Sequence, residues 1–350
     1  MVVAAAAPKL SLQCKTIAGD TSTIRSLDWD RSRFDIEFGL RNGTTYNAFL
    51  VRGERTALID TSHAKFRDTW IPLLKEQIEP TAIDVLIVSH TEPDHSGLIG
   101  DLIDLNPDIE IVGSKVALQF LQDQVHRPFK SRAVKSGEEL DLGTNPESGI
   151  QHRFEFLSAP NLHWPDTIFS FDHGTGILYT CDAFGLHYCS DDVFDSDPGA
   201  IAPDFRFYYD CLMGPNARSV LQALKRMGGL PEINTIAVGH GPLLRHHLSH
   251  WVNDYREWSG QRSKGESYAA VCYLSQYGFS DRISQAIAHG IGKAEAQVQL
   301  VDLRATDPQE LTALIGDAKA VVVPTWPAEP DGELQASIGT LLAALHPKQL

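Results

Sequence analysis

Residues 83–97 read IDVLIVSHTEPDHSG, an apolar run followed at once by a short polar loop. The run Ile83–Ser89 is typical of a strand that is buried on both faces. The loop places four potential metal ligands within six residues, and these are His90, Glu92, Asp94 and His95. Capping of a following helix by Asp94 or Ser96 is the alternative interpretation, but it would leave three potential ligands without a role. We therefore favour a metal site directly after this strand.

Three more potential ligands stand at the ends of other predicted strands. They are His163 after the strand 153–158, Asp182 after the strand 176–180 and His240 after the strand 233–238. Each has an ordinary explanation when taken alone, as a loop histidine or a turn aspartate. Strands that end at the same edge of a sheet bring such residues to one place, so these positions together predict a shared site.

The donor chemistry of this set predicts the kind of metal. The set holds three carboxylates and three or four imidazoles, depending on whether His95 takes part, and no cysteine at an obvious ligand position. A soft-metal site would use cysteine, and a single zinc ion needs only three or four ligands. Two divalent first-row ions with a bridging hydroxide would balance the three carboxylates. The set therefore favours two redox-active iron ions, and manganese remains an alternative.

Composition and charge argue against several other classes of protein. The 350 residues carry 45 acidic and 30 basic side chains, and the resulting formal net charge of −15 repels nucleic acid and anionic membranes. No apolar run reaches the roughly 20 residues of a membrane-spanning helix, and the short apolar start does not look like a cleaved signal peptide. Five scattered cysteines without CxxC spacing suit a reducing compartment. We expect a cytoplasmic protein, or a protein of the chloroplast stroma if the source is a eukaryote, with no nucleic-acid or membrane partner.

The chain before residue 241 alternates between strand-like and helix-like stretches. This pattern predicts a sheet-on-sheet core with helices outside. Within it, Arg33–Leu40 and Thr44–Arg52 alternate with period two around a turn at 41–43, which predicts a β-hairpin.

A second unit is predicted after a polar stretch at 258–266. Its apolar runs and amphipathic stretches alternate as in a parallel, doubly wound domain. The expected strands are 268–274, 298–303 and 320–323, and the expected helices are 280–291 and 307–316. We therefore expect a first domain at 1–257, a linker at 258–267 and a second domain at 268–350.

Five short stretches resemble the motifs of flavodiiron proteins, which join a metallo-β-lactamase-like domain carrying two irons to a flavodoxin-like domain. These stretches are His90–Gly97, Asn161–Thr167, Cys181–Gly185, Gly239–Gly241 and Gly43–Asn47. The resemblance covers almost the whole chain, and residues 26–30 and 210–216 are most similar to cyanobacterial and chloroplast members. Glu92 stands where zinc hydrolases of the same superfamily have histidine. The resemblance implies an α+β fold: an αββα sandwich followed by the first part of a flavodoxin-like α/β domain.

The resemblance also implies a role for each residue of the set. One iron would be held by His90, Glu92 and His163, the other by Asp94 and His240, with Asp182 as the bridge. His95 matches a position that binds iron in some members and stays outside the ligand shell in others. The implied activity is reduction of O2 to water, with reduction of NO to N2O left open. The implied partners are an NAD(P)H-linked flavin domain or a reduced redox protein, and a second subunit in a head-to-tail homodimer or a hetero-oligomer.

The start of the second unit contains a candidate flavin site. A loop with hydroxyls at both ends and a glycine inside precedes a helix, which suits a phosphate group, and it resembles the phosphate loop of flavodoxin. The expected FMN contacts are Ser275, Gln276, Tyr277, Gly278, Phe279, Ser280, Pro324, Thr325 and Trp326. Trp326 could stack on the flavin ring or pack in the core. A flavodoxin sheet has five strands, and this sequence stops after the third strand and its helix. We therefore expect this chain to be part of a longer protein, and we expect the chain by itself to hold FMN weakly.

Two other functions remain open from the sequence alone. One is a zinc-dependent hydrolase on the same scaffold, against which Glu92 argues. The other is a non-catalytic partner subunit of a flavodiiron hetero-oligomer, which would be expected to have lost ligands, whereas every matching ligand position is present here.

Overall fold

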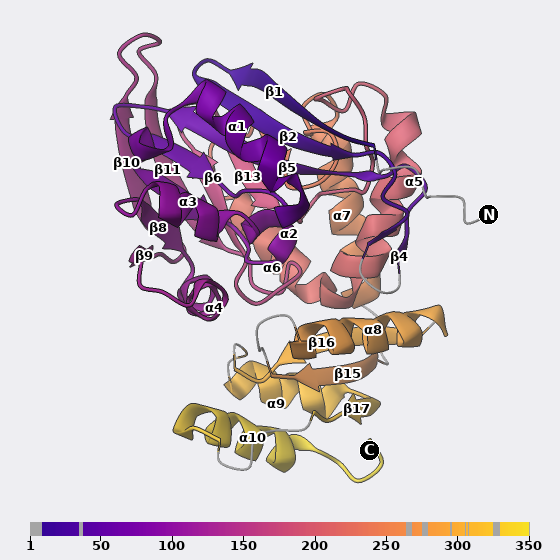
Figure 1. Cartoon of the computed structure of the whole chain (residues 1–350). Helices are drawn as coiled ribbons and strands as arrows, with labels where there is room; N and C mark the ends of the chain where they lie inside the picture. Colours follow the sequence, from indigo (N-terminus) through magenta and orange to yellow (C-terminus); the bar gives the residue numbers. More distant parts are fainter. Residues whose placement is uncertain are drawn as a thin grey trace, which may run out of the picture.

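The structure, a computed structural model, describes residues 9–34, 38–263, 268–274, 279–294, 296–304, 306, 308–324 and 330–349. Two sheets lie face to face in a larger unit, and a three-stranded sheet forms a smaller unit beside it (Figure 1). The larger unit contains every residue of the predicted metal site.

The first sheet of the larger unit has seven strands in the order β1-β2-β5-β6-β7-β8-β9. Its first four strands pair antiparallel, and the pairs from β6 to β9 are parallel. The strands are β1 (Leu10–Ala18), β2 (Thr21–Asp28), β5 (Thr44–Arg52), β6 (Thr56–Ile59), β7 (Val85–Val88), β8 (Glu110–Gly113) and β9 (Lys130–Ala133). All four residues of β7 are buried, as the apolar run at 83–89 predicts.

The second sheet has five strands in the order β10-β11-β12-β13-β14, with a parallel pair at β13 and β14. The strands are β10 (Glu139–Thr144), β11 (Gln151–Ser158), β12 (Ile168–Asp172), β13 (Ile177–Cys181) and β14 (Thr235–Val238). Apolar side chains from both sheets form one continuous core, in which Phe49 of β5 meets Tyr179 of β13 with ring centroids 5.1 Å apart. This packing stacks the two sheets and brings the ends of their strands to one edge.

Helices cover the outer faces of both sheets and complete the predicted αββα sandwich (Figure 1). Those over the first sheet are η1 (Ala64–Phe66), α1 (Arg67–Gln77), η2 (Pro80–Ala82), α2 (Pro93–Ser96), α3 (Ile99–Leu105) and α4 (Lys115–Val125). The helices that follow β13 and β14 in the chain are α5 (Pro198–Tyr208), η3 (Tyr209–Met213), η4 (Gly214–Asn216), α6 (Ala217–Met227) and α7 (Leu248–Ser263). Ser114 begins α4 as an N-cap, since its hydroxyl accepts a hydrogen bond from the Ala117 N–H at 3.0 Å.

One expectation from the sequence is wrong. The described residues of Arg33–Leu40 do not pair with Thr44–Arg52; instead β3 (Arg33–Phe34) and β4 (Phe38–Gly39) form a sheet of their own, and β5 lies between β2 and β6. Alternating polarity predicts a strand but does not identify its partner, and β5 is a central strand that is buried along almost its whole length. Within the linker expected at 258–267, the residues up to Ser263 continue helix α7, where Trp258 packs on the core and Ser259 is buried.

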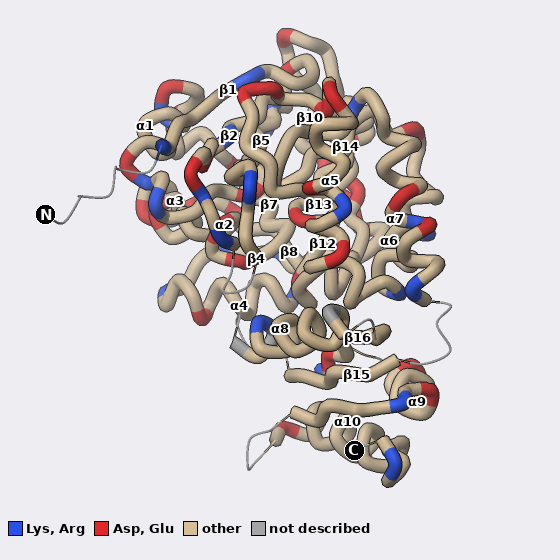
Figure 2. Tube along the Cα trace, turned by 90° about the vertical axis from the view of Figure 1, so that its right-hand side faces the viewer, with Lys and Arg blue, Asp and Glu red and all other residues tan. Residues whose placement is uncertain are grey.

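The smaller unit is a parallel sheet in the order β16-β15-β17, as the alternating pattern predicts. Its elements are β15 (Tyr268–Tyr273), α8 (Phe279–Lys293), β16 (Gln297–Asp302), α9 (Pro308–Asp317), β17 (Ala320–Val322) and α10 (Gly332–Ala344). Helix α8 lies on the side of this sheet that faces the larger unit, and α9 and α10 lie on the other side (Figures 1 and 2). The Tyr273 hydroxyl donates a hydrogen bond to Asn161 Oδ1 at 3.2 Å, which joins the two units.

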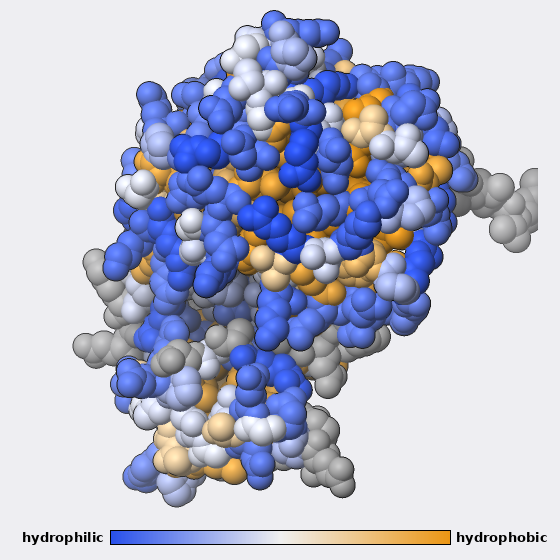
Figure 3. All heavy atoms as spheres, turned by 90° about the vertical axis from the view of Figure 1, so that its left-hand side faces the viewer, coloured by the Kyte–Doolittle hydropathy of each residue, from blue (hydrophilic) through white to orange (hydrophobic). Residues whose placement is uncertain are grey.

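Acidic and basic side chains are interspersed along the outer helices and loops (Figure 2). On the face shown in Figure 3, hydrophilic residues dominate, and apolar residues show between them across the larger unit. Among the described residues, no helix has the length and apolar character needed to cross a membrane.

Candidate metal centre

The structure brings all seven predicted metal-site residues together at one edge of the stacked sheets. Four of them follow β7, and the others lie after β11, β13 and β14, so strand ends deliver every one. The seven are His90, Glu92, Asp94, His95, His163, Asp182 and His240, each no more than 4% exposed. They form two groups that could each hold a metal ion, His90–Glu92–His163–Asp182 and Asp94–His95–His240, and within each group the ligand atoms lie within 4.8 Å of one another.

Asp182 lies between the two groups. Its Oδ2 is 3.3 Å from Nε2 of both His90 and His163. Its Oδ1 is 3.0 Å from Nε2 of His95 and 3.3 Å from Nε2 of His240. One carboxylate therefore presents one oxygen to each group, which is the arrangement that a carboxylate bridge between two cations requires.

The other carboxylates each belong to one group. Glu92 Oε2 lies 3.0 Å from His163 Nε2, and Asp94 Oδ2 lies 3.2 Å from His240 Nε2. Among the described residues, both oxygens of Asp94, Oδ2 of Asp182 and Nε2 of His90 are buried and form no hydrogen bond, although imidazole nitrogens lie 3.2–3.3 Å from the two carboxylates. Because buried carboxylate oxygens that form no hydrogen bond are costly, these atoms fit a site that receives cations. The hard and borderline donor set fits divalent first-row metals.

The charges of the cluster shift the pKa values of its members. Burial lowers the pKa of His163, but Glu92 and Asp182 outweigh burial and raise it to about 10. Burial likewise lowers the pKa of His240, and Asp182 and Asp94 raise it to about 10. Burial raises the pKa of Asp182, yet the surrounding imidazoles hold it well below its ordinary value. The cluster therefore holds ionised carboxylates and protonated imidazoles, and a bound metal would displace those protons.

Three of the four imidazole rings of the cluster contact, through Nδ1, residues that do not belong to the cluster. The Nδ1 of His90 lies 2.9 Å from Asp166 Oδ1, and the Nδ1 of His240 lies 2.6 Å from the Thr45 carbonyl oxygen. The Nδ1 of His163 lies 2.7 Å from the side-chain amide of Gln285. These contacts turn Nε2 of each ring toward the centre of the cluster, as outer partners do in metal sites.

Sequence reasoning assigned no role to these outer partners. Asp166 lies in the motif at 161–167 and Thr45 in the motif at 43–47, so membership of these stretches was the available signal. Thr45 acts through its carbonyl, which every residue has. Gln285 belongs to the other unit, and nothing in its local sequence connects it with His163.

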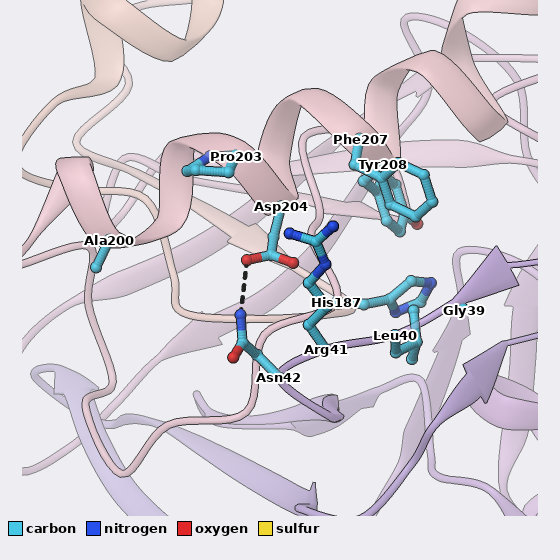
Figure 4. Close-up of a pocket in the computed structure, with 10 residues that line it drawn as sticks. All are labelled: Gly39, Leu40, Arg41, Asn42, His187, Ala200, Pro203, Asp204, Phe207 and Tyr208. Atoms are coloured by element: carbon cyan, nitrogen blue, oxygen red, sulfur yellow. Dashed lines mark hydrogen bonds between the residues drawn. The ribbon is translucent and has the colours of Figure 1, made fainter.

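A cavity in the larger unit lies beside the cluster, because His187, one of its lining residues, contacts His240. It has a volume of about 460 Å³, and Figure 4 shows His187 and Tyr208 toward one end of it and Arg41, Asn42 and Asp204 farther along. The His187 ring lies 4.8 Å from the His240 ring, and its Nδ1 is 2.9 Å from Thr44 Oγ1. Burial and the charge of His240 keep the pKa of His187 well below its ordinary value, so this ring is neutral.

The expected flavin contacts are described only in part. Ser275, Gln276, Tyr277, Gly278, Thr325 and Trp326 lie outside the described residues. Phe279 begins α8, and Ser280 donates a hydrogen bond to the Leu274 carbonyl. Ser280 and Pro324 line the same cavity of about 320 Å³ at the ends of the parallel strands, so these two expected contacts lie at one place.

The family described as ODP family beta lactamase matches residues 44–241, more than half of the chain. This family is consistent with the αββα fold and with a metal centre at the strand ends.

Curated relatives narrow the class further. The chain is 57% identical over 342 residues to putative diflavin flavoprotein A 3 from Nostoc sp., covering 97% of this chain and 58% of the relative. It is 56% identical to diflavin flavoprotein A 1 from Synechocystis sp., covering 98% of this chain and 59% of the relative. The chain thus spans less than three fifths of the length of these relatives.

Solved structures agree with these relatives. The metal-soaked Flv1 flavodiiron core from Synechocystis sp. superposes with a TM-score of 0.87 at 30% identity, covering 98% of this chain and 84% of that one. Rubredoxin oxygen:oxidoreductase from Desulfovibrio gigas, at 24% identity and a TM-score of 0.66, shares the fold over 95% of this chain and 82% of that one. The chain belongs to the flavodiiron proteins.

Proposed function

We propose that this chain forms the core of an oxidoreductase that reduces O2 to water at two iron ions, with FMN as the source of electrons. The observation that carries this proposal is the position of Asp182, whose two oxygens face two separate ligand groups. His90, Glu92 and His163 would hold one iron, and Asp94 and His240 would hold the other. His95 lies 3.6 Å from Asp94 and completes the second group.

The residues of the site have distinct tasks in this proposal. When bound, the two irons would supply Lewis acidity and electrons for the reduction of O2. Asp182 holds the two ligand groups at a fixed separation, and Asp166 and the Thr45 carbonyl orient the rings of His90 and His240. Burial of all seven side chains keeps bulk water away from the cluster, which protects reactive species formed there.

Electrons would reach the site through FMN held by the smaller unit. Ser280 and Pro324 support this part, because they line one cavity at the ends of parallel strands, where doubly wound domains bind their ligands. We propose the division into a metal domain at 1–257 and an FMN domain from 268, joined within 258–267. The proposed partners are a second subunit in a head-to-tail dimer or hetero-oligomer, and an NAD(P)H-linked flavin domain or reduced redox protein as electron donor.

The test is reconstitution of the chain with ferrous iron under anaerobic conditions, followed by a stopped-flow measurement of its oxidation. We expect O2 to oxidise both irons rapidly, and parallel measurements with NO would give the ratio of the two activities. Retention of stoichiometric zinc together with hydrolysis of esters or thioesters would instead support the hydrolase alternative. A loaded chain that O2 oxidises no faster than free ferrous iron would contradict the proposed activity.

A further inference from the structure

Helix α8 of the smaller unit presents one face to the metal-bearing unit. Arg282, Gln285 and His289 lie three and four residues apart, so they share one side of the helix. Arg282 Nη2 lies 4.0 Å from Glu92 Oε1. The His289 ring meets the Phe38 ring edge-on, with centroids 5.0 Å apart. Between these two contacts, Gln285 reaches the candidate metal centre itself.

Gln285 and His163 form a buried contact across the boundary between the units. The side-chain nitrogen Nε2 of Gln285 lies 2.7 Å from His163 Nδ1, with Oε1 on the other branch of the same amide, and the two residues are 7% and 2% exposed. Nε2 of the same ring faces inward, 3.0 Å from Glu92 and 3.3 Å from Asp182. A metal on Nε2 requires Nδ1 to carry the proton, and the carbonyl oxygen of an amide can accept it. Either end of the amide can be turned toward the ring, because a half-turn about its last bond exchanges oxygen and nitrogen.

The contact from Gln285 completes a pattern in the outer partners. His90 is held by Asp166 and His240 by the Thr45 carbonyl, both from the larger unit. His163 is held through its Nδ1 by a residue 122 positions away in the chain, from the smaller unit. We propose that Gln285 is a positioning residue that fixes the ring and tautomer of His163 for metal binding, so that the metal site is complete only when α8 is docked. This inference rests on the proposed function.

The chemistry of an amide distinguishes Gln285 from the partner of His90. Asp166 is a carboxylate and adds negative charge behind its ring, whereas an amide accepts the proton without adding charge. Partners of this kind commonly change metal affinity by about 10–100-fold when they are removed. Substitution with leucine keeps most of the side-chain volume and removes the hydrogen bond. Substitution with glutamate keeps an acceptor oxygen at the same distance from the backbone.

The test uses Co²⁺ as the probe and the whole chain as the protein. Co²⁺ affinity would be measured by chelator competition for Gln285→Leu, Gln285→Glu and the control Ile283→Ala, which changes a side chain of α8 that is 64% exposed. We expect Gln285→Leu to bind Co²⁺ about 10–100-fold more weakly. Gln285→Glu keeps an acceptor and adds negative charge, so it should bind Co²⁺ at least as tightly as the unchanged chain, and Ile283→Ala should retain the unchanged affinity. In NMR spectra of the Co²⁺ protein, Gln285→Leu should lose the shifted, slowly exchanging Nδ1–H signal of His163.

The outcomes separate this inference from the function on which it rests. If the unchanged chain binds two Co²⁺ and Gln285→Leu binds them equally well, the role of Gln285 is contradicted and the metal site stands. If Gln285→Glu loses as much affinity as Gln285→Leu, the residue serves packing and not the acceptance of a proton. If Gln285→Leu fails to fold, the Nδ1–H signal of the unchanged chain still decides, because rapid exchange of that proton with solvent would overturn the proposal. An unchanged chain that binds no Co²⁺ would contradict the proposed function itself.

Discussion

Replacing Asp182 with asparagine keeps a side chain of the same size at the centre of the proposed metal site and removes its charge. The residue is 1% exposed, and its oxygens lie 3.0–3.3 Å from imidazole nitrogens on both sides. A cation held by either group would lie within about 4 Å of this charge, which attracts each unit of positive charge on the cation by about 4 kcal/mol at an effective dielectric constant of about 20. For each ion this corresponds to a loss of at least about a thousandfold in affinity.

The assay for Asp182→Asn is iron content after gel filtration, together with a chelator titration. We expect the unchanged chain to retain two irons and Asp182→Asn to lose at least one of them, with its fold kept because the residue follows a strand and supports no sheet hydrogen bond through its side chain. Asp101→Asn is the matched control, because Asp101 pairs with Arg67 at the surface, 2.8 Å away. Full iron content and unchanged chelator resistance in Asp182→Asn would refute the bridging role.

Three further predictions concern the surroundings of the site. Asp166→Asn should weaken metal binding by about 10–100-fold in the same titration, because Asp166 orients His90; an unchanged affinity would show that the contact is incidental. Asn47→Ala should lower the free energy of unfolding by about 2–3 kcal/mol in urea, since the Asn47 amide donates to the Val238 and Gly241 carbonyls at 2.9 Å; a loss below about 0.5 kcal/mol would contradict this. Burial lowers the pKa of His152, but Asp172 and Asp20 raise it above its ordinary value. The stabilisation from His152 should therefore be full below about pH 6 and decline as the pH rises through the raised pKa. The difference in free energy of unfolding between the unchanged chain and His152→Gln should accordingly shrink with increasing pH. A difference that grows with pH would contradict the raised pKa.

The position of the candidate site could be predicted from the sequence because its residues follow strands. His163, Asp182 and His240 are far apart in the chain, but each stands just after a run that could be recognised as a strand. Parallel and stacked strands that end at one edge leave little freedom in where such residues lie. The predicted alternation of the smaller unit was equally informative, since β15 and β16 are largely buried and α8 is amphipathic.

The remaining features depend on contacts that local sequence does not contain. The two-stranded sheet of β3 and β4 replaced the expected hairpin because partner choice is decided by the whole sheet. The Thr45 carbonyl holds His240 whatever side chain the residue carries. Gln285 reaches His163 through the docking of two separately folded units, and no spacing rule within either unit reports that docking.

In the proposed site, the seven buried residues hold two irons, one on either side of the Asp182 carboxylate. An anomalous difference map, recorded at the iron absorption edge from crystals of the chain loaded with ferrous iron under anaerobic conditions, would locate these ions. We expect two peaks in the cluster, one beside each oxygen of Asp182. A single peak, or peaks that appear at the zinc edge and not at the iron edge, would rule out the two-iron site.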